Sequence, residues 1–137
     1  MTAHSAFGRQ ERILVVAGAM LGTALRYATF RIWYHRPGTF PTTTLVVNCI
    51  GAFALGALVV VIADHRRTRA WHWFGRVGVL GGFTTFSAYA VELAQYVRGG
   101  EPLIGLTYAC AMSVLAIVAA VAGSEIVRNR RTLGRER

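Results

Sequence analysis

The sequence predicts an all-α membrane protein with four transmembrane helices and a break in the third. Three observations predict this class. Of the 137 residues, 54% are hydrophobic, and the mean hydropathy is +0.43. The apolar residues fall into four blocks long enough to cross a bilayer, which takes about 20 residues each. Glycine and hydroxyl residues interrupt the third block. The expected spans are residues 13–33, 44–63, 77–97 and 103–127.

Residues 1–137 are expected to form a single integral membrane domain, because the connections between the blocks are short and both ends are charged. Buried core helices of a soluble protein would need more polar surface than this chain offers. The first block continues to Arg26 without a convincing small-residue cleavage site, so no cleavable signal peptide is expected.

The interruption in the third block contains Gly81, Gly82, Thr84, Thr85 and Ser87. Glycines loosen a helix, and each backbone group that is freed inside hydrocarbon must find another partner. Such a segment is tolerated where it is buried in protein or lines a cavity that holds water or ions. The pattern therefore predicts a broken transmembrane helix beside an ion site.

All 15 basic residues are arginine, and the net charge is +9. The arginines flank the spans, which is typical of topology signals and disfavours nucleic-acid binding. The larger group predicts a multi-pass protein of the cell membrane with both termini in the cytoplasm. That group is Arg9, Arg12, Arg66, Arg67, Arg69, Arg76, Arg128, Arg130, Arg131, Arg135 and Arg137; the opposite group is Arg26, Arg31, Arg36 and Arg98.

Polar and aromatic residues inside the spans are the candidate functional residues. Arg26 either snorkels to the headgroups or concentrates anions near an entrance. Asn48 either bonds a neighbouring helix or contacts a permeant species. Phe86 and Tyr89 lie three residues apart and share a helix face, where ring edges can favour an anion. Glu92 is interpreted as an interfacial carboxylate that pairs with an arginine.

The fourth span adds the hydroxyls of Thr107, Tyr108 and Ser113. Hydroxyls, an amide, ring edges and arginine suit a small anion better than a cation. The sequence contains no nucleophile–base pair, metal-ligand cluster or phosphate loop, and Cys49 and Cys110 are expected to be small buried hydrophobes. Enzymatic activity is therefore not expected.

Three motifs together resemble the small fluoride channels of the Fluc (CrcB) family. They are Gly18-Ala-Met-Leu-Gly-Thr-Ala-Leu-Arg26-Tyr27, the stretch from Pro41 to Phe53 that contains Asn48, and the stretch from Gly81 to Glu92. They occur in order and in the first three spans, and the resemblance covers about residues 13–127.

The resemblance implies an antiparallel dimer with two pores and a structural sodium ion at its centre. The matching sodium ligands are the main-chain carbonyls of Gly81 and Thr84. The resemblance further implies that Arg26 lies at a vestibule and that a fluoride pathway passes Asn48, Phe86, Tyr89, Tyr108 and Ser113.

The function that the resemblance implies is passive, selective export of cytoplasmic fluoride across the cell membrane, which gives fluoride resistance. One alternative is a proton-coupled small multidrug-type exporter, for which Glu92 is the candidate carboxylate. Another is a membrane subunit that transports nothing and whose polar residues only join helices.

The sequence departs from the family pattern at three places. Tyr89 replaces the usual second phenylalanine, and Thr43 replaces a glycine. Tyr108 and Ser113 are five residues apart, not four, which turns them about 140° apart on a helix instead of about 40°. Both residues can line one track only if the helix bulges. The partner within the dimer, an identical copy or a homologous subunit, stays open.

Overall fold

The computed structural model describes residues 8–33, 39–63 and 68–135, which contain helices and no strand. Four stretches are long and apolar enough to cross a membrane, which confirms the predicted number of membrane-length helices. The elements are α1 (Arg9–Ile32), α2 (Thr42–Ala63), α3 (Thr68–Trp71), the π-helix η1 (His72–Leu80), α4 (Gly81–Phe83), α5 (Phe86–Arg98) and α6 (Pro102–Arg135).

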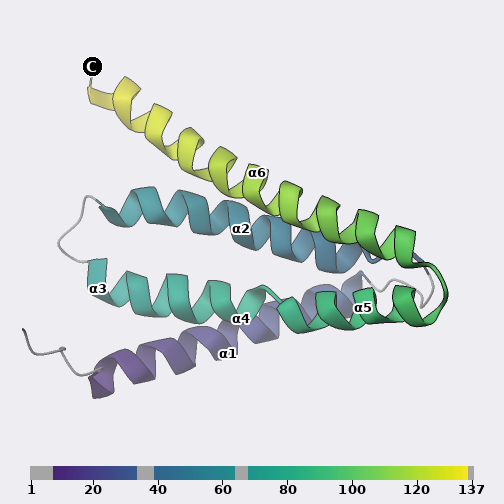
Figure 1. The fold of residues 1–137 in the computed structure, drawn as a ribbon. Coiled ribbons are helices and arrows are strands. Elements are labelled where there is room, and N and C mark those ends of the chain that lie inside the picture. Colours follow the sequence, from purple (N-terminus) through teal and green to yellow (C-terminus); the bar gives the residue numbers. More distant parts are fainter. Residues whose placement is uncertain (1–7, 34–38, 64–67, 136–137) are drawn as a thin grey trace, which may run out of the picture.

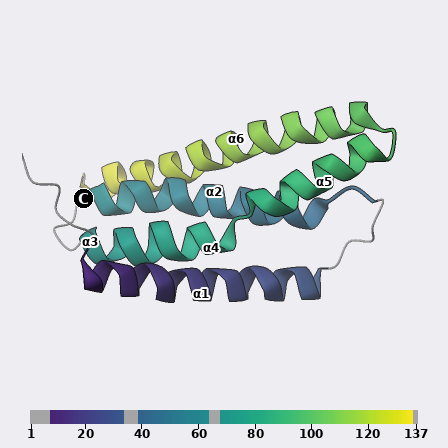
Figure 2. The same cartoon turned by 60° about the horizontal axis from the view of Figure 1, so that its bottom comes forward.

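The third stretch is made of α3, η1, α4 and α5, and it changes neighbours along its length (Figures 1 and 2). Its first half packs against α1, and α5 packs against α6. α2 packs along α6. The crossover from α1 to α6 happens between α4 and α5, where the ribbon visibly leaves its helical path.

Glycines allow close backbone approach on both sides of this arrangement. A Cβ atom added to Gly22 would collide with the carbonyl oxygen of Val79 in η1, and one added to Gly123 would collide with that of Phe53 in α2. The α1–η1 and α2–α6 interfaces therefore place backbone directly against backbone, as small residues do in membrane proteins.

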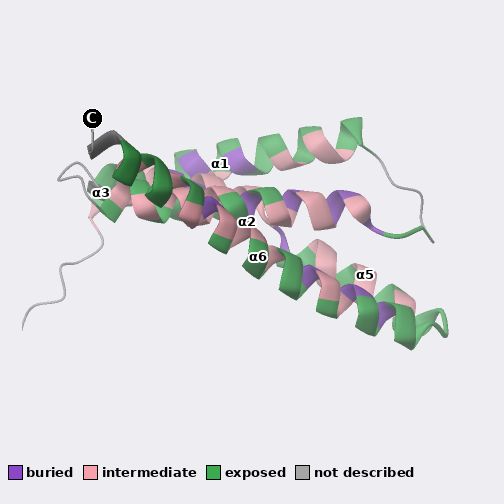
Figure 3. Ribbon diagram, turned by 90° about the horizontal axis from the view of Figure 1, so that it is seen from above, coloured by how far each residue is buried: buried purple, intermediate pink, exposed green. Residues whose placement is uncertain are grey.

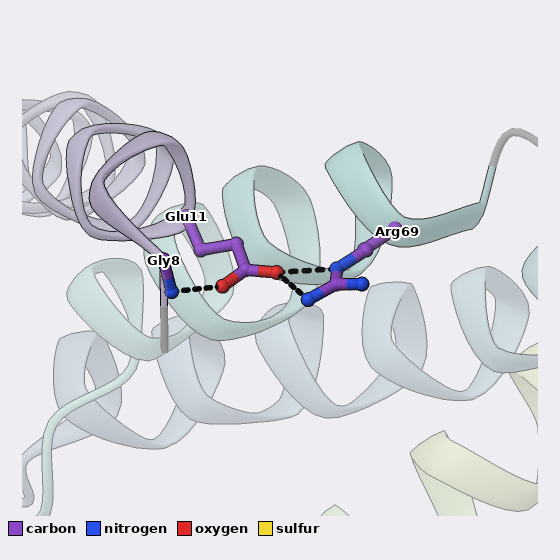
Figure 4. Close-up of polar contacts among 3 residues, drawn as sticks. All are labelled: Gly8, Glu11 and Arg69. Carbon is purple, nitrogen blue, oxygen red and sulfur yellow. Dashed lines mark hydrogen bonds and ion pairs between the residues drawn. The ribbon is translucent and has the colours of Figure 1, made fainter. Parts of the chain in front are cut away.

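The start of α1, the end of α2, α3 and the end of α6 lie at the same end of the bundle (Figure 1). Two arginines hold this end together. Arg69 pairs with Glu11, whose other oxygen accepts the Gly8 N–H and so caps α1 (Figure 4). Arg131 of α6 donates to the carbonyls of Val60 and Val61, the last turn of α2, at 2.8 and 3.1 Å.

The same end carries Arg9, Arg12, Arg69, Arg128, Arg130 and Arg131, all members of the larger arginine group from the sequence. Other residues used in the sequence argument lie outside the described residues: Arg36, Arg66, Arg67 and Arg137.

Little of the chain is fully buried, and green exposed residues run along the outer faces of the helices (Figure 3). Many of the exposed side chains are large and apolar, such as Phe86 at 79% and Met20 at 68% exposure. An apolar exterior of this kind suits contact with lipid or with another membrane chain.

Candidate functional site between α4 and α5

Two residues with extended backbone separate α4 from α5. Thr84 has ψ 156°, and Thr85 has φ −143° and ψ 113°. The side chain of Asn48, from α2, lies against this segment. Its Oδ1 accepts the N–H of Thr85 at 2.8 Å, and its Nδ2 donates to the carbonyl of Thr85 at 3.1 Å. One amide side chain thus satisfies both backbone groups of a residue that is only 5% exposed.

The threonines of this segment also end one helix and begin the next. Thr85 caps α5, because its Oγ1 accepts the N–H of Ala88 at 3.1 Å. Thr84 donates both its N–H and its hydroxyl to the carbonyl of Leu80, at 3.0 and 2.8 Å. The carbonyl of Thr84 in turn accepts from Nη1 of Arg26 at 3.1 Å.

Arg26 therefore reaches from α1 to the extended segment. Sequence reasoning left its side chain either at the headgroups or at a vestibule; the structure places the guanidinium against Thr84, with the side chain half-buried. A carbonyl oxygen has two lone pairs, so one lone pair on Thr84 stays available for another ligand.

The carbonyl of Gly81 loses its usual partner at the same place. In a regular helix it would accept the N–H of Thr85, four residues on, but that N–H goes to Asn48. Gly81 is exposed, and a Cβ atom added to it would meet open space. The two carbonyls singled out in the sequence, Gly81 and Thr84, thus both belong to the interruption.

A cavity of about 440 Å³ lies on the α2–α6 side of the interruption. Its lining brings together most of the candidate residues from the sequence: Asn48, Gly81, Thr84, Phe86, Tyr89 and Ser113. A second cavity, of about 650 Å³, lies on the α1 side and is lined by Arg26 and Glu92 among others. Thr85 lines both cavities, so the extended segment separates them.

A row of aromatic rings runs from the interruption along α5 to α6. The ring centroids of Phe86 and Tyr89 are 5.6 Å apart, and those of Tyr89 and Tyr108 are 5.5 Å apart. Beyond them, Glu92 accepts hydrogen bonds from the hydroxyls of Tyr108, at 2.7 Å, and of Thr44. The carboxylate expected to pair with an arginine therefore has hydroxyl partners on α2 and α6.

Thr44 is a residue of this cluster that the sequence reasoning did not select. Its spacing in the sequence could have indicated it, because Thr44 and Asn48 are four residues apart and share one face of α2. Both side chains bond to the third membrane-length stretch, Thr44 at Glu92 and Asn48 at Thr85.

Tyr108 and Ser113 are separated in the way their five-residue spacing requires. The structure describes α6 as one continuous α-helix, without the bulge that would bring them onto one track. Tyr108 is fully buried and gives its hydroxyl proton to Glu92. Ser113 is exposed, lines the 440 Å³ cavity, and donates to the carbonyl of Ala109 at 2.9 Å.

Comparison with known proteins places this arrangement in a family. The profile described as "CrcB-like protein, Camphor Resistance (CrcB)" matches residues 13–124. A protein of Streptomyces avermitilis named fluoride-specific ion channel FluC 2 is 43% identical over 109 residues, which are 76% of this chain and 67% of the relative.

A second relative, named fluoride-specific ion channel FluC 2 in Nocardia farcinica, is 37% identical over 120 residues, 85% of this chain and 84% of the relative. A protein named fluoride-specific ion channel FluC in Saccharophagus degradans is 34% identical over 110 residues, 80% of this chain and 83% of the relative. The matched region contains the interrupted third stretch and every candidate residue described above. The chain belongs to the CrcB-like family.

Proposed function

We propose that the protein is a passive, fluoride-selective channel of the cell membrane that exports cytoplasmic fluoride and gives fluoride resistance. The observation that carries the proposal is the 440 Å³ cavity beside the interruption, whose lining gathers Asn48, Phe86, Tyr89 and Ser113 and contains no carboxylate among the described residues. The names of three similar family members, all fluoride-specific ion channels, support the same ion.

The chemistry of the lining suits a small, strongly hydrated anion. The edges of the rings of Phe86 and Tyr89 carry positive potential, and these rings succeed each other along α5. Ring edges and hydroxyls can replace water around fluoride without changing a covalent bond. The protein is accordingly a channel and not an enzyme.

A structural sodium ion fits the interruption. The Gly81 carbonyl lacks its helical partner, and the Thr84 carbonyl keeps one lone pair beside Arg26. Hard cations bind oxygen, and these two carbonyls from each of two chains would supply four ligands. When bound, sodium would hold two interrupted helices together. The chain's own part is to present these oxygens, which Asn48 and Arg26 keep in position.

The assembly proposed is an antiparallel dimer with two pores. Such a dimer would cover the exposed apolar faces and complete the sodium ligands. The partner is either a second copy or a homologous subunit inserted the opposite way. The relatives of Streptomyces avermitilis and Nocardia farcinica are both named FluC 2, and a numbered name implies a second protein of that kind, which supports a homologous partner. Both termini are proposed to be cytoplasmic, since the start of α1 and the end of α6 both lie at the arginine-rich end.

The experiment is ion efflux from liposomes that contain the purified protein, followed with a fluoride electrode and, in parallel, a chloride electrode. We expect rapid fluoride efflux that needs no proton gradient, little chloride efflux, and a requirement for sodium. Chloride efflux as fast as fluoride efflux would reject the proposal, and so would fluoride movement that depends on a proton gradient.

A further inference from the structure

Arg76 lies in the middle of η1, five residues before Gly81. From the sequence it counted among the arginines that flank the spans and report topology. The structure places it differently: Arg76 lines the 440 Å³ cavity together with Asn48, Gly81 and Phe86. Its charge therefore belongs to the candidate pathway as well as to the membrane edge.

Arg76 gives this cavity a positive formal charge. Among the described residues of the lining it is the only one with a formal charge, and the others are apolar, aromatic, amide or hydroxyl residues. The cavity on the α1 side differs, because it contains the carboxylate of Glu92 as well as Arg26. A single cation with low-dielectric walls around it attracts anions and raises their local concentration.

The guanidinium of Arg76 also has no hydrogen-bond or ion-pair partner within the part of the chain that the structure describes. Arg26 bonds to Thr84, and Arg69 pairs with Glu11, so both have a structural task. Arg76 makes no hydrogen bond or ion pair with a described residue, and it is exposed. Its N–H donors are thus available to an ion in the cavity.

We propose that Arg76 captures fluoride at the mouth of this cavity and delivers it to the ring edges of Phe86 and Tyr89. This inference rests on the proposed function. Arg76 lies in the half of the third stretch nearer to the arginine-rich end (Figure 1), so it serves the entrance on the side that we propose to be cytoplasmic. Capture by a charge acts on the rate of entry, which makes it sensitive to salt.

The test compares Arg76→Gln with Arg76→Lys and with the matched control Arg130→Gln in fluoride efflux from liposomes. Arg130 is also exposed and without a partner among the described residues, but it lies at the end of α6, away from the cavity. At low fluoride and low ionic strength we expect Arg76→Gln to slow efflux about tenfold, and the deficit to shrink in high salt. Arg76→Lys should restore most of the rate, and Arg130→Gln should stay within about twofold of the original protein.

Equal rates for Arg76→Gln and Arg130→Gln would overturn the inference and would show an arginine that only snorkels. A deficit that does not change with salt or fluoride concentration, with a lowered melting temperature in detergent, would also overturn it, because a structural role would then explain the loss. If the original protein carries no fluoride, the proposed function fails and this inference fails with it. An active original protein with an unaffected Arg76→Gln variant refutes this inference alone.

Discussion

Asn48 shows how one residue can stabilise an irregular backbone inside a membrane. Asn48 lies in α2, and its Oδ1 and Nδ2 both bond to Thr85, which precedes α5 and lies 37 positions further along the chain. Its Nδ2 also lies 3.8 Å from the sulfur of Met112. Sequence spacing left open whether Asn48 joins helices or contacts the permeant ion. The structure shows that it joins helices at a place where it also lines the cavity.

Replacing Asn48 with alanine should destabilise the protein. The buried N–H of Thr85 would lose its partner, at about 1–3 kcal/mol, whereas its carbonyl, at the N-cap of α5, would lose one donor and keep its helical donor. We expect Asn48→Ala to lower the melting temperature in detergent and to reduce fluoride efflux. The matched control is Cys49→Ala on the same helix, where no hydrogen bond is lost among the described residues. Identical melting temperatures for the two variants would contradict this role.

Tyr89 is the departure from the family pattern that lies in the candidate pathway. Its ring contacts Phe86 and Tyr108, while its hydroxyl makes no hydrogen bond with the described part of the chain. Tyr89→Phe therefore removes no internal hydrogen bond, and fluoride efflux should stay within about twofold of the original rate. Phe86→Ile, which removes a ring edge from the same face, should instead abolish most efflux. Loss of fluoride efflux in the Tyr89→Phe variant would identify the hydroxyl as an essential ligand.

At the scale of the elements, the third stretch combines two irregularities. η1 is a π-helix of nine residues, and two extended residues separate α4 from α5. π-helical segments are rare and often occur at functional sites. Together these features let the stretch leave α1 and join α6, and they turn the carbonyl groups of Gly81 and Thr84 away from regular helical pairing.

Thr84 should act on sodium through its backbone. Its hydroxyl bonds to Leu80, whereas its carbonyl faces Arg26, so Thr84→Ala leaves the proposed ligand oxygen in place. We expect this variant to keep sodium-dependent fluoride efflux, measured with sodium and with a large organic cation in its place. Efflux that no longer depends on sodium would count against a carbonyl site.

Gly51 allows a second test of the extended segment, in which an atom is added against Thr84 instead of removed from it. A Cβ atom at Gly51 would collide with the side-chain methyl of Thr84, so Gly51→Ala should push the extended segment out of position and weaken efflux. The double variant with Thr84→Ala lacks that methyl and should recover. Failure of the double variant to recover would show that Gly51 matters through another contact.

At the scale of the whole molecule, the charge distribution bears on assembly. The arginines at the start of α1, in α3 and at the end of α6 lie at one end of the bundle, and Arg31 and Arg98 lie at the other end. A protein that inserts in both orientations should have little such bias. We therefore hypothesise a protomer with fixed topology that pairs with a homologous subunit inserted the opposite way.

The measurement is accessibility labelling of a C-terminal tag in cells that express this chain alone. We expect a single orientation with the C-terminus inside, and charge reversal at Arg128 and Arg130 should produce mixed orientations. Equal populations of inside and outside C-termini in the original protein would favour a homodimer and defeat the heterodimer hypothesis.

The sequence by itself determined the four membrane-length helices, because length and hydropathy depend on the local composition of each stretch. Spacing also placed Phe86 beside Tyr89 and separated Tyr108 from Ser113, since helix periodicity is a local rule. The tertiary structure alone decided that Asn48 meets Thr85, that Arg26 meets Thr84, that Thr44 and Tyr108 share Glu92, and that Arg76 enters the cavity. These contacts join residues on different helices. They depend on how the helices are positioned against one another, and that register is set by close packing at glycines such as Gly22 and Gly123, which no single stretch of sequence specifies.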